Sequence, residues 1–405
     1  MTDPLGQSQV LPYLKGLSNH GYQFTILSCE KRRNYALYKD EVEKITTSAG
    51  LKWVPLTYHK NPPVISSIYD TIRLKKKAEQ LHKKENFDMV HTRPGIPALI
   101  GLEMKKKLGV KFLNDIREFY VDSRIEGNIW NGNKFFYKKI YEFFRQKERE
   151  EMEKSDGIVC LTAAAEKIIK QWPEYKSNLP LQVIPCSVDT NLFDPDNIDL
   201  QLKDRFKSQL NIKEDDFIIS YLGSLGSWYL IEEMMHFFKI ISNKNPKAKF
   251  LLISPSPKEA IKKQAREIGL DENKIVVTEA KRNEVPSLLS FSRFSVFFIK
   301  PCYSKQSSSP TKHGEIMAMG IPVISNEGVG DVATIIEKYQ SGIVLKKFDE
   351  LQYEKAVKII FGNRFFDKTS IRNGAIDFYD LNNAVEKYKK VYDEILKPIP
   401  LPMND

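Results

Sequence analysis

A lysine, a histidine and a glutamate lie close together in the stretch SSSPTKHGEIMAMGIPVI, residues 307–324. The pattern predicts a short helix that carries Lys312, His313 and Glu315 in its first turns, runs through Met319 and stops at Gly320. Free N–H groups and the positive dipole end at such a helix start favour an anion. Lys312 would add a positive charge for a diphosphate, and Glu315, on the same face, would accept hydrogen bonds from ribose hydroxyls. The spacing therefore indicates a nucleotide site.

Hydroxyl groups precede the same helix. Ser308, Ser309 and Thr311 would add donors for phosphate oxygens. A plainer interpretation stays open, in which Ser309 caps the helix and Lys312 and Glu315 form a surface ion pair.

Glycines mark a second strand–helix junction, YLGSLGSWY (221–229). Gly223, followed by Ser224, permits close approach of the backbone to a ligand, although a plain turn is the alternative. The stretch is not the full G-x-G-x-x-G pattern, so it gives little support to a dinucleotide-dependent dehydrogenase. NEGVGDV (326–332) is a third such junction, which indicates a composite site.

Charged residues follow two strands predicted in the N-terminal half. HTRPG (91–95) offers His91 and Arg93, and NDIREF (114–119) offers Asp115 and Arg117. Clusters of both signs are common in active sites, but each residue could equally belong to a structural ion pair. DPD (194–196) resembles a metal-binding D-x-D motif but does not follow a strand, so we predict no metal site.

Short apolar runs alternate with helical patterns along the whole chain. This alternation predicts an α/β protein with parallel sheets in two doubly wound, Rossmann-like domains that face a cleft. The predicted strands are 22–28, 51–56, 87–92, 110–115, 157–162 and 181–185, then 217–223, 249–254, 274–279, 294–299, 321–325 and 342–346.

Composition shifts suggest where the domains meet. We predict an N-terminal domain over 1–186, a linker over 187–200, a C-terminal domain over 201–378, and a terminal helix and tail over 379–405. The N-terminal series lacks the first strand, which normally occupies the centre of such a sheet. We expect a true start upstream of Met1 rather than a sheet rebuilt without this strand, because a gap would leave backbone groups unpaired in the core.

The chain of 405 residues has a net charge of +10 but no apolar run long enough to span a bilayer and no signal pattern. We therefore expect a cytoplasmic protein. The charge suits phosphorylated ligands or anionic lipid, and no nucleic-acid-binding motif is present. The segment 133–147 alternates aromatic and basic residues and could lie on the inner face of an anionic membrane, although core packing explains its aromatic residues equally well.

The sequence resembles bacterial GT-B fold glycosyltransferases of the large retaining family four, the glycosyl transferases group 1 type. The resemblance runs through TDPLGQSQVLPYLKGLSNHGY, DIREFYVDSRIEGNIW, IPCSVDTNLF, YLGSLGSWY and SPTKHGEIMAMGIPVI. It implies transfer of a sugar with retention, from a nucleotide-diphosphate sugar to a surface polysaccharide or a lipid-linked acceptor. It implies no cofactor and no essential metal.

The resemblance also implies roles for individual residues. Glu315 would bind the ribose and Lys312 the diphosphate, and these two would be the catalytic residues. Gly223 and Ser224 would lie near the phosphates, and Gly6 and Gln7 would approach the donor sugar. The acceptor side would include His91, Arg93, Asp115 and Arg117, and the terminal helix would cross back to the N-terminal domain.

Some positions depart from the family pattern. Ser307 stands where many members have the first of two glutamates, and SLGSWY replaces a familiar Arg and Lys. A sugar-nucleotide epimerase or a catalytically silent nucleotide-binding relative is therefore the alternative.

Overall fold

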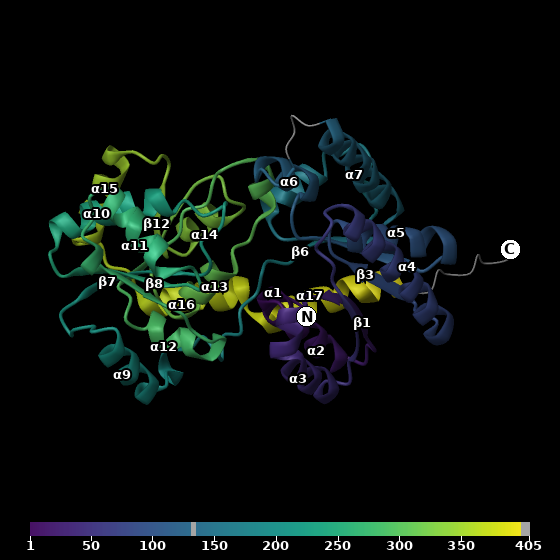
Figure 1. The fold of residues 1–405 in the computed structure, drawn as a ribbon, viewed down its shortest axis with the longest axis horizontal. Helices are drawn as coiled ribbons and strands as arrows, with labels where there is room; N and C mark the ends of the chain where they lie inside the picture. Colours follow the sequence, from purple (N-terminus) through teal and green to yellow (C-terminus); the bar gives the residue numbers. More distant parts are fainter. Residues whose placement is uncertain (131–134, 398–405) are drawn as a thin grey trace. The chain divides into compact units, whose positions relative to one another are not determined.

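The computed structural model describes residues 1–130 and 135–397, which fold as two compact units. Unit 1 comprises Met1–Pro185 together with the C-terminal segment from Leu381, and unit 2 comprises Cys186–Asp380. Figure 1 shows both units, with labels on many of their elements. All twelve predicted strands are present, because each apolar run is long enough for a strand and is bounded by turn residues.

Unit 2 contains one parallel sheet of six strands in the order β12-β11-β10-β7-β8-β9. Its strands are β7 (Phe217–Leu222), β8 (Ala248–Ile253), β9 (Ile275–Thr278), β10 (Phe294–Val296), β11 (Val323–Asn326) and β12 (Gly342–Leu345). The strand order reverses between β7 and β10, the position at which open α/β sheets bind ligands.

The helices of unit 2 bury the strands almost completely except for the edge strand β9, as expected for a parallel sheet. They are α9 (Leu200–Gln209), α10 (Ile231–Lys244), α11 (Lys258–Glu267), α12 (Val285–Leu289), α13 (Thr311–Ala318), α14 (Val332–Lys338), α15 (Glu350–Ile360) and α16 (Lys368–Tyr379). Short 3₁₀ turns are η1 (Pro195–Asn197), η2 (Glu272–Lys274), η3 (Arg282–Glu284) and η4 (Tyr303–Ser307).

The segment predicted as a linker, 187–200, packs into unit 2. Val188 and Phe193 are fully buried in its core, and Asp194 caps η1 and pairs with Arg372 at 2.9 Å. These two apolar residues were not predicted as core residues, because polar turn residues surround them in the sequence. The carboxylate of Asp194 is therefore already engaged in structural contacts.

Unit 1 contains two parallel sheets, in the orders β1-β2 and β3-β4-β5-β6. The strands are β1 (Thr25–Glu30), β2 (Lys52–Thr57), β3 (Met89–Thr92), β4 (Lys111–Ile116), β5 (Gly157–Cys160) and β6 (Leu181–Val183). The helices are α1 (Pro4–Gln9), α2 (Leu11–Ser18), α3 (Arg32–Ser48), α4 (Ile65–Glu85), α5 (Ile96–Leu108), α6 (Tyr120–Glu126), α7 (Phe135–Lys154), α8 (Ala163–Ile169) and α17 (Leu381–Leu396).

The break between the two sheets lies between β1 and β3, where the sequence lacks its expected central strand. One hydrophobic cluster continues past the break, since Leu27 of β1 and Val90 of β3 both pack against it. Most residues of β1 and β3 are only half-buried, whereas β5 is fully buried. The edge strands β2 and β6 are half-buried as well, so partial exposure follows the edges of both sheets.

The terminal helix α17 belongs to unit 1. Its apolar face packs on α2, with Tyr13 and Tyr388 in an edge-to-face contact whose ring centroids are 5.4 Å apart. In the described ranges, no helix combines the length and apolar composition needed to cross a membrane.

Close packing between α2 and α17 predicts the effect of one substitution. A Cβ atom at Gly16 would lie 2.5 Å and 3.0 Å from the two methyl groups of Val385. We expect Gly16→Ala to lower the free energy of unfolding by about 1 kcal/mol, since overpacking costs about 1–3 kcal/mol and improved helix propensity returns about 1 kcal/mol. Urea unfolding measures this change.

Gly226→Ala is the matched control, because a Cβ atom at Gly226 would meet nothing within 4 Å. A Gly16→Ala variant as stable as the parent would show that α17 does not pack on α2 this closely.

Candidate functional site

The candidate site lies in unit 2 at the carboxyl ends of β7 and β10. The loop that follows β7 begins at Gly223, whose φ of +114° is unusual for any residue except glycine. A Cβ atom at this position would lie 2.9 Å from the ammonium nitrogen of Lys312. The structure thus brings together the loop and the helix, α13, that the sequence predicts separately.

The ammonium group of Lys312 is enclosed by aromatic side chains. Its nitrogen lies 4.2 Å from the ring centroid of Tyr221 and 3.7 Å from that of Tyr229. It also donates a hydrogen bond of 3.1 Å to the hydroxyl of Tyr221, which in turn donates to the carbonyl of Ser224 at 2.8 Å. Both rings are contacts that the sequence analysis missed, since a tyrosine gives no motif signal.

Burial decides the electrostatics of this lysine. Lys312 is only 7% exposed, and desolvation lowers the pKa of its amino group well below the ordinary value, opposed by the charge of Glu315. An anion beside the nitrogen would stabilise the charged form. The group is therefore suited to respond to a bound diphosphate.

Glu315 is also buried, at 6% exposure, and is held by an arginine from another loop. Arg282 of η3 donates a hydrogen bond of 2.8 Å to a carboxylate oxygen of Glu315, and its guanidinium lies 5.3 Å from the ring centroid of Phe193. The interpretation of Lys312 and Glu315 as a surface ion pair is wrong, because both are buried and Glu315 pairs with Arg282. Sequence reasoning missed Arg282, which lies 33 residues from its partner.

His313 points into the core rather than toward a ligand. It is fully buried between Phe297 and Tyr379, and a hydrogen bond of 2.9 Å joins its Nδ1 to the hydroxyl of Tyr379. Within the described residues its Nε2 has no hydrogen-bond partner. Burial lowers the pKa of this imidazole to about 3, so it is neutral at physiological pH.

The hydroxyl residues before α13 differ in their contacts. Pro310, not Ser309, is the N-cap residue, and no side chain caps the helix start. The hydroxyl of Ser309 instead accepts a hydrogen bond of 3.2 Å from the backbone N–H of Cys186. Ser308 and Thr311 are half-buried beside it. The predicted cap is therefore wrong, and the first amides of α13 receive no side-chain acceptor.

The four predicted acceptor-side residues meet in unit 1 at the carboxyl ends of β3 and β4. Asp115 is fully buried, and it accepts a hydrogen bond of 2.8 Å from Tyr388 and lies 3.2 Å from Nε2 of His91. The Arg117 guanidinium donates to the Tyr388 hydroxyl at 3.1 Å, and Arg93 donates to the backbone carbonyl of Gln9. The positive charge of Arg117 and the bond to His91 outweigh burial and hold the pKa of Asp115 below its usual range.

Gly6 and Gln7 lie in α1 of unit 1. A Cβ atom at Gly6 would meet the backbone carbonyl of Met1 at 2.6 Å, so the close approach that requires glycine here is to the chain's own first residue. The Gln7 amide donates to the carbonyl of Thr2 at 3.4 Å. Their approach to a donor sugar stays a prediction.

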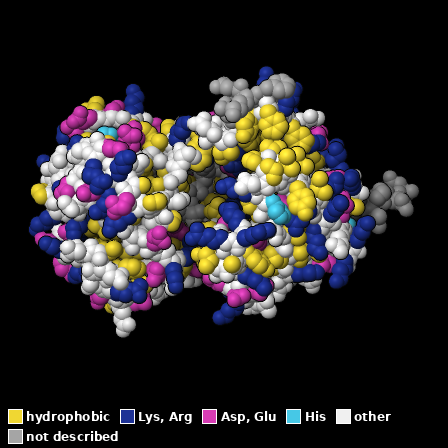
Figure 2. All heavy atoms as spheres, in the orientation of Figure 1, with side chains coloured by type: hydrophobic (Ala, Val, Ile, Leu, Met, Phe, Trp, Pro, Cys, Tyr) yellow, Lys and Arg dark blue, Asp and Glu magenta, His cyan; other side chains and the backbone are white. Residues whose placement is uncertain are grey.

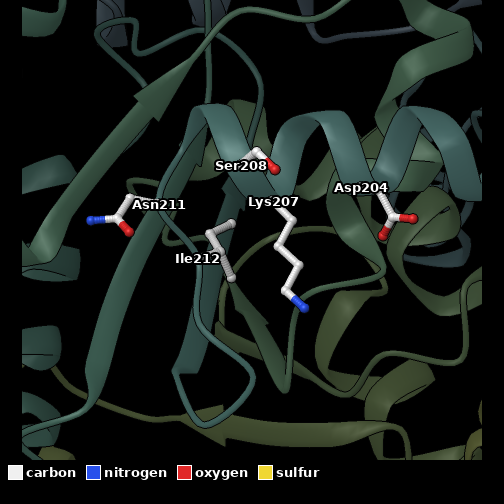
Figure 3. A pocket seen from close by; sticks show the side chains of 5 residues that line it. All are labelled: Asp204, Lys207, Ser208, Asn211 and Ile212. Carbon is white, nitrogen blue, oxygen red and sulfur yellow. The ribbon is translucent and has the colours of Figure 1, made fainter.

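A separate hollow of about 400 Å³ lies at the end of α9 in unit 2. Figure 3 shows its lining side chains, Asp204, Lys207, Ser208, Asn211 and Ile212, pointing in different directions rather than converging. None of the predicted site residues lines it, so it does not compete with the site around Lys312.

The buried imidazole of His313 predicts a pH dependence of stability. A histidine in the unfolded chain has a pKa near 6.5, whereas the pKa of His313 in the native state is about 3. Between these values the unfolded state binds a proton and the native state does not. The free energy of unfolding therefore decreases as the pH falls from about 6.5 toward 3. We expect this group to cost about 2 kcal/mol between pH 8 and pH 5. Urea unfolding at the two pH values gives the difference.

His313→Gln is the comparison, because glutamine keeps a polar side chain but does not titrate. Between pH 8 and pH 5, the free energy of unfolding of the parent should fall by about 2 kcal/mol more than that of the variant. A gap independent of pH would show that His313 is not buried in its neutral form.

Comparisons with known proteins address the fold and the family. Residues 203–375 match the family model described as glycosyl transferases group 1. No curated protein matches the chain in sequence.

Solved structures match over most of the chain. A glycosyltransferase from Rickettsia africae ESF-5 is 16% identical with a TM-score of 0.69, over 98% of this chain and 97% of that one. A sucrose-phosphate synthase from Thermosynechococcus elongatus is 14% identical with a TM-score of 0.69, over 92% and 98%. Anabaena Alr3699/HepE in complex with UDP-glucose is 11% identical with a TM-score of 0.67, over 92% and 99%. Residues 203–375 therefore resemble the glycosyl transferases group 1 family, and the chain has the fold of the two-domain GT-B glycosyltransferases.

Proposed function

We propose that the protein transfers a sugar from a nucleotide-diphosphate sugar, with the diphosphate bound beside Lys312. The observation that carries this proposal is the buried ammonium group at the start of α13, next to the Gly223 loop. A leaving diphosphate gains negative charge as the glycosidic bond breaks. A preorganised cation and the uncapped amides of a helix start would stabilise that charge more than the ground state.

The known structures support the class of donor. Anabaena Alr3699/HepE has this fold and is described in complex with UDP-glucose and with UDP. For this chain we propose a nucleotide-diphosphate sugar, with Glu315 accepting hydrogen bonds from the ribose. Arg282 is proposed as a positioning residue, since it touches Glu315 and would fix the orientation of its carboxylate.

Many family members carry an Arg and a Lys in the loop after β7. We propose that Lys312 supplies their positive charge here. The β7 loop has no basic residue between Gly223 and Leu230, and the position of the first family glutamate is Ser307. Ser307 is fully buried and donates to the carbonyl of Ser304 at 2.8 Å, so it serves the η4 turn. Of the basic residues near the proposed donor site, Lys312 is the one beside Gly223, whereas Arg282 contacts Glu315 and Lys305 lies 3.6 Å from the ring centroid of Trp228.

The finer parts of the proposal concern reaction type and acceptor. We propose transfer with retention, without an essential metal or cofactor, to a surface polysaccharide or a lipid-linked acceptor on the cytoplasmic side of a membrane. The aromatic and basic segment 133–147 would contact an anionic membrane. Within this segment, Phe136 and Phe143 are about half exposed, which supports that contact, whereas Phe135 and residues 133–134 lie outside the described side chains.

The donor site is tested by nucleotide binding to Lys312→Met. A nucleoside diphosphate at 100 times its dissociation constant should raise the Tm of unit 2 in the parent by roughly 5–10 °C. Loss of a charge-assisted hydrogen bond should weaken binding about 10- to 100-fold in Lys312→Met. Thermal unfolding with UDP, GDP, ADP, CDP and TDP measures both effects and identifies the base.

Lys263→Met, which removes a lysine 71% exposed, is the matched control and should bind like the parent. Without nucleotide, Lys312→Met should be at least as stable as the parent, because it removes a desolvated amine. Unchanged nucleotide affinity in Lys312→Met would refute the site. Nucleotide release without a transferred sugar would indicate the epimerase instead, and binding without turnover the silent relative.

The positioning role of Arg282 predicts non-additive losses. Glu315→Gln and Arg282→Met should each weaken nucleotide binding. In the double variant, Arg282→Met should weaken binding little beyond the effect of Glu315→Gln, which corresponds to a coupling energy of about 0.5–3 kcal/mol. Isothermal titration calorimetry on the four proteins of the cycle gives the coupling. Arg205→Met is the control, since Arg205 pairs with Glu284 of the same turn at 3.2 Å. Additive losses would mean that Arg282 contacts the ligand directly.

A further inference from the structure

The first two turns of α4 in unit 1 have their polar side inward and their apolar side outward. Ile65, Ile68, Tyr69 and Ile72 recur at helical spacing and are 65%, 56%, 53% and 47% exposed. On the opposite side, Ser66 and Asp70 are buried. A soluble helix normally does the reverse, so this arrangement indicates an apolar partner.

The buried polar side is well satisfied. Asp70 accepts a hydrogen bond of 2.7 Å from the backbone N–H of His59, and its other oxygen lies 2.6 Å from Nδ1 of the same residue. Arg73 donates to Asp70 at 3.3 Å and to the carbonyl of Thr57 at 3.0 Å. This cluster fixes the rotation of α4 and hence keeps the isoleucines turned outward.

The exposed charges of the stretch that carries this face are of one sign, although Lys75 pairs with Glu103 of α5 at 2.5 Å. Between Tyr58 and Ala78 the only acidic residue is Asp70, which is buried, whereas the same stretch contains His59, Lys60, Arg73, Lys75, Lys76 and Lys77. Lys60 and Lys76 are exposed at its two ends. Figure 2 shows hydrophobic side chains on one face of unit 1 that extend from the region of α6 and α7 down to a histidine, with Lys and Arg at their border.

We propose that this face, which we call the α4 face (Tyr58, Ile65, Ile68, Tyr69 and Ile72), docks on an anionic lipid surface. The isoleucines and tyrosines would enter the boundary of the acyl chains, while Lys60 and Lys76 would meet lipid phosphates. Asp70, the only acidic residue of this stretch, is buried, so its exposed charges are basic, and basic residues beside exposed aliphatic side chains attract anionic lipid headgroups.

The α4 face is distinct from the segment 133–147, which the sequence indicated. It deepens the proposed function and rests on it in one respect, because a lipid-linked acceptor is found at a membrane. The binding of lipid itself is independent of the donor site. The two proposals can therefore fail separately.

The test is flotation of the full chain with vesicles of phosphatidylcholine alone or mixed equally with phosphatidylglycerol. We expect the parent to float with the anionic vesicles and to be released by high salt. The combined variant Ile65→Ser, Ile68→Ser, Ile72→Ser should lose at least about tenfold in vesicle binding, because its apolar contact area is removed. Its Tm and its Tm shift with nucleotide should equal those of the parent, since the three side chains are exposed.

The matched control replaces three exposed apolar residues of unit 2, Leu200→Ser, Leu351→Ser and Phe365→Ser, and should float like the parent. The proposal would be overturned if the parent did not bind anionic vesicles, or if the triple variant bound them as strongly as the parent. A parent dimer that the triple variant abolishes, without vesicle binding, would assign the face to a second copy instead. Vesicle binding without any nucleotide shift would keep the α4 face and refute the donor site.

Discussion

The burial of one ammonium group governs the organisation of unit 2 around its candidate site. Desolvation penalises the charge on Lys312, and the tyrosine rings and hydroxyl around it offset only part of that cost. Such an arrangement persists where a ligand supplies the missing negative charge. Gly223 follows from the same constraint, because any side chain there would press on the nitrogen of Lys312.

The sheet explains why these groups converge. β7 and β10 are neighbours at the reversal of strand order, so the loop after one and the helix reached from the other meet at the same edge. Part of this was predictable from the sequence, because each strand is an apolar run and glycine follows β7. The α/β class and all twelve strands were predicted in this way, and the strand–helix junctions were predicted to form one composite site.

Long-range side-chain contacts were not predictable in the same way. Tyr221 lies 91 residues from Lys312, and Tyr388 lies 273 residues from Asp115, so no local pattern connects either pair. His313 appeared in the same motif as Lys312 and Glu315, yet the rotation of α13 turns it into the core. Spacing identifies which residues share an element, but the packing of that element decides which of them face a ligand.

In unit 1, the side chains predicted to contact an acceptor already form hydrogen bonds with one another and with α17. Both ring nitrogens of His91 are engaged, Nδ1 with the Tyr392 hydroxyl at 2.8 Å and Nε2 with Asp115. Tyr388 donates to Asp115 while it accepts from Arg117, so α17 is held to β4 through a buried carboxylate. An acceptor that used His91 or Asp115 would have to displace a tyrosine of α17. Because breaking one member of such a network leaves a buried charge unpaired, these residues stabilise the attachment of α17 whether or not an acceptor also reaches them.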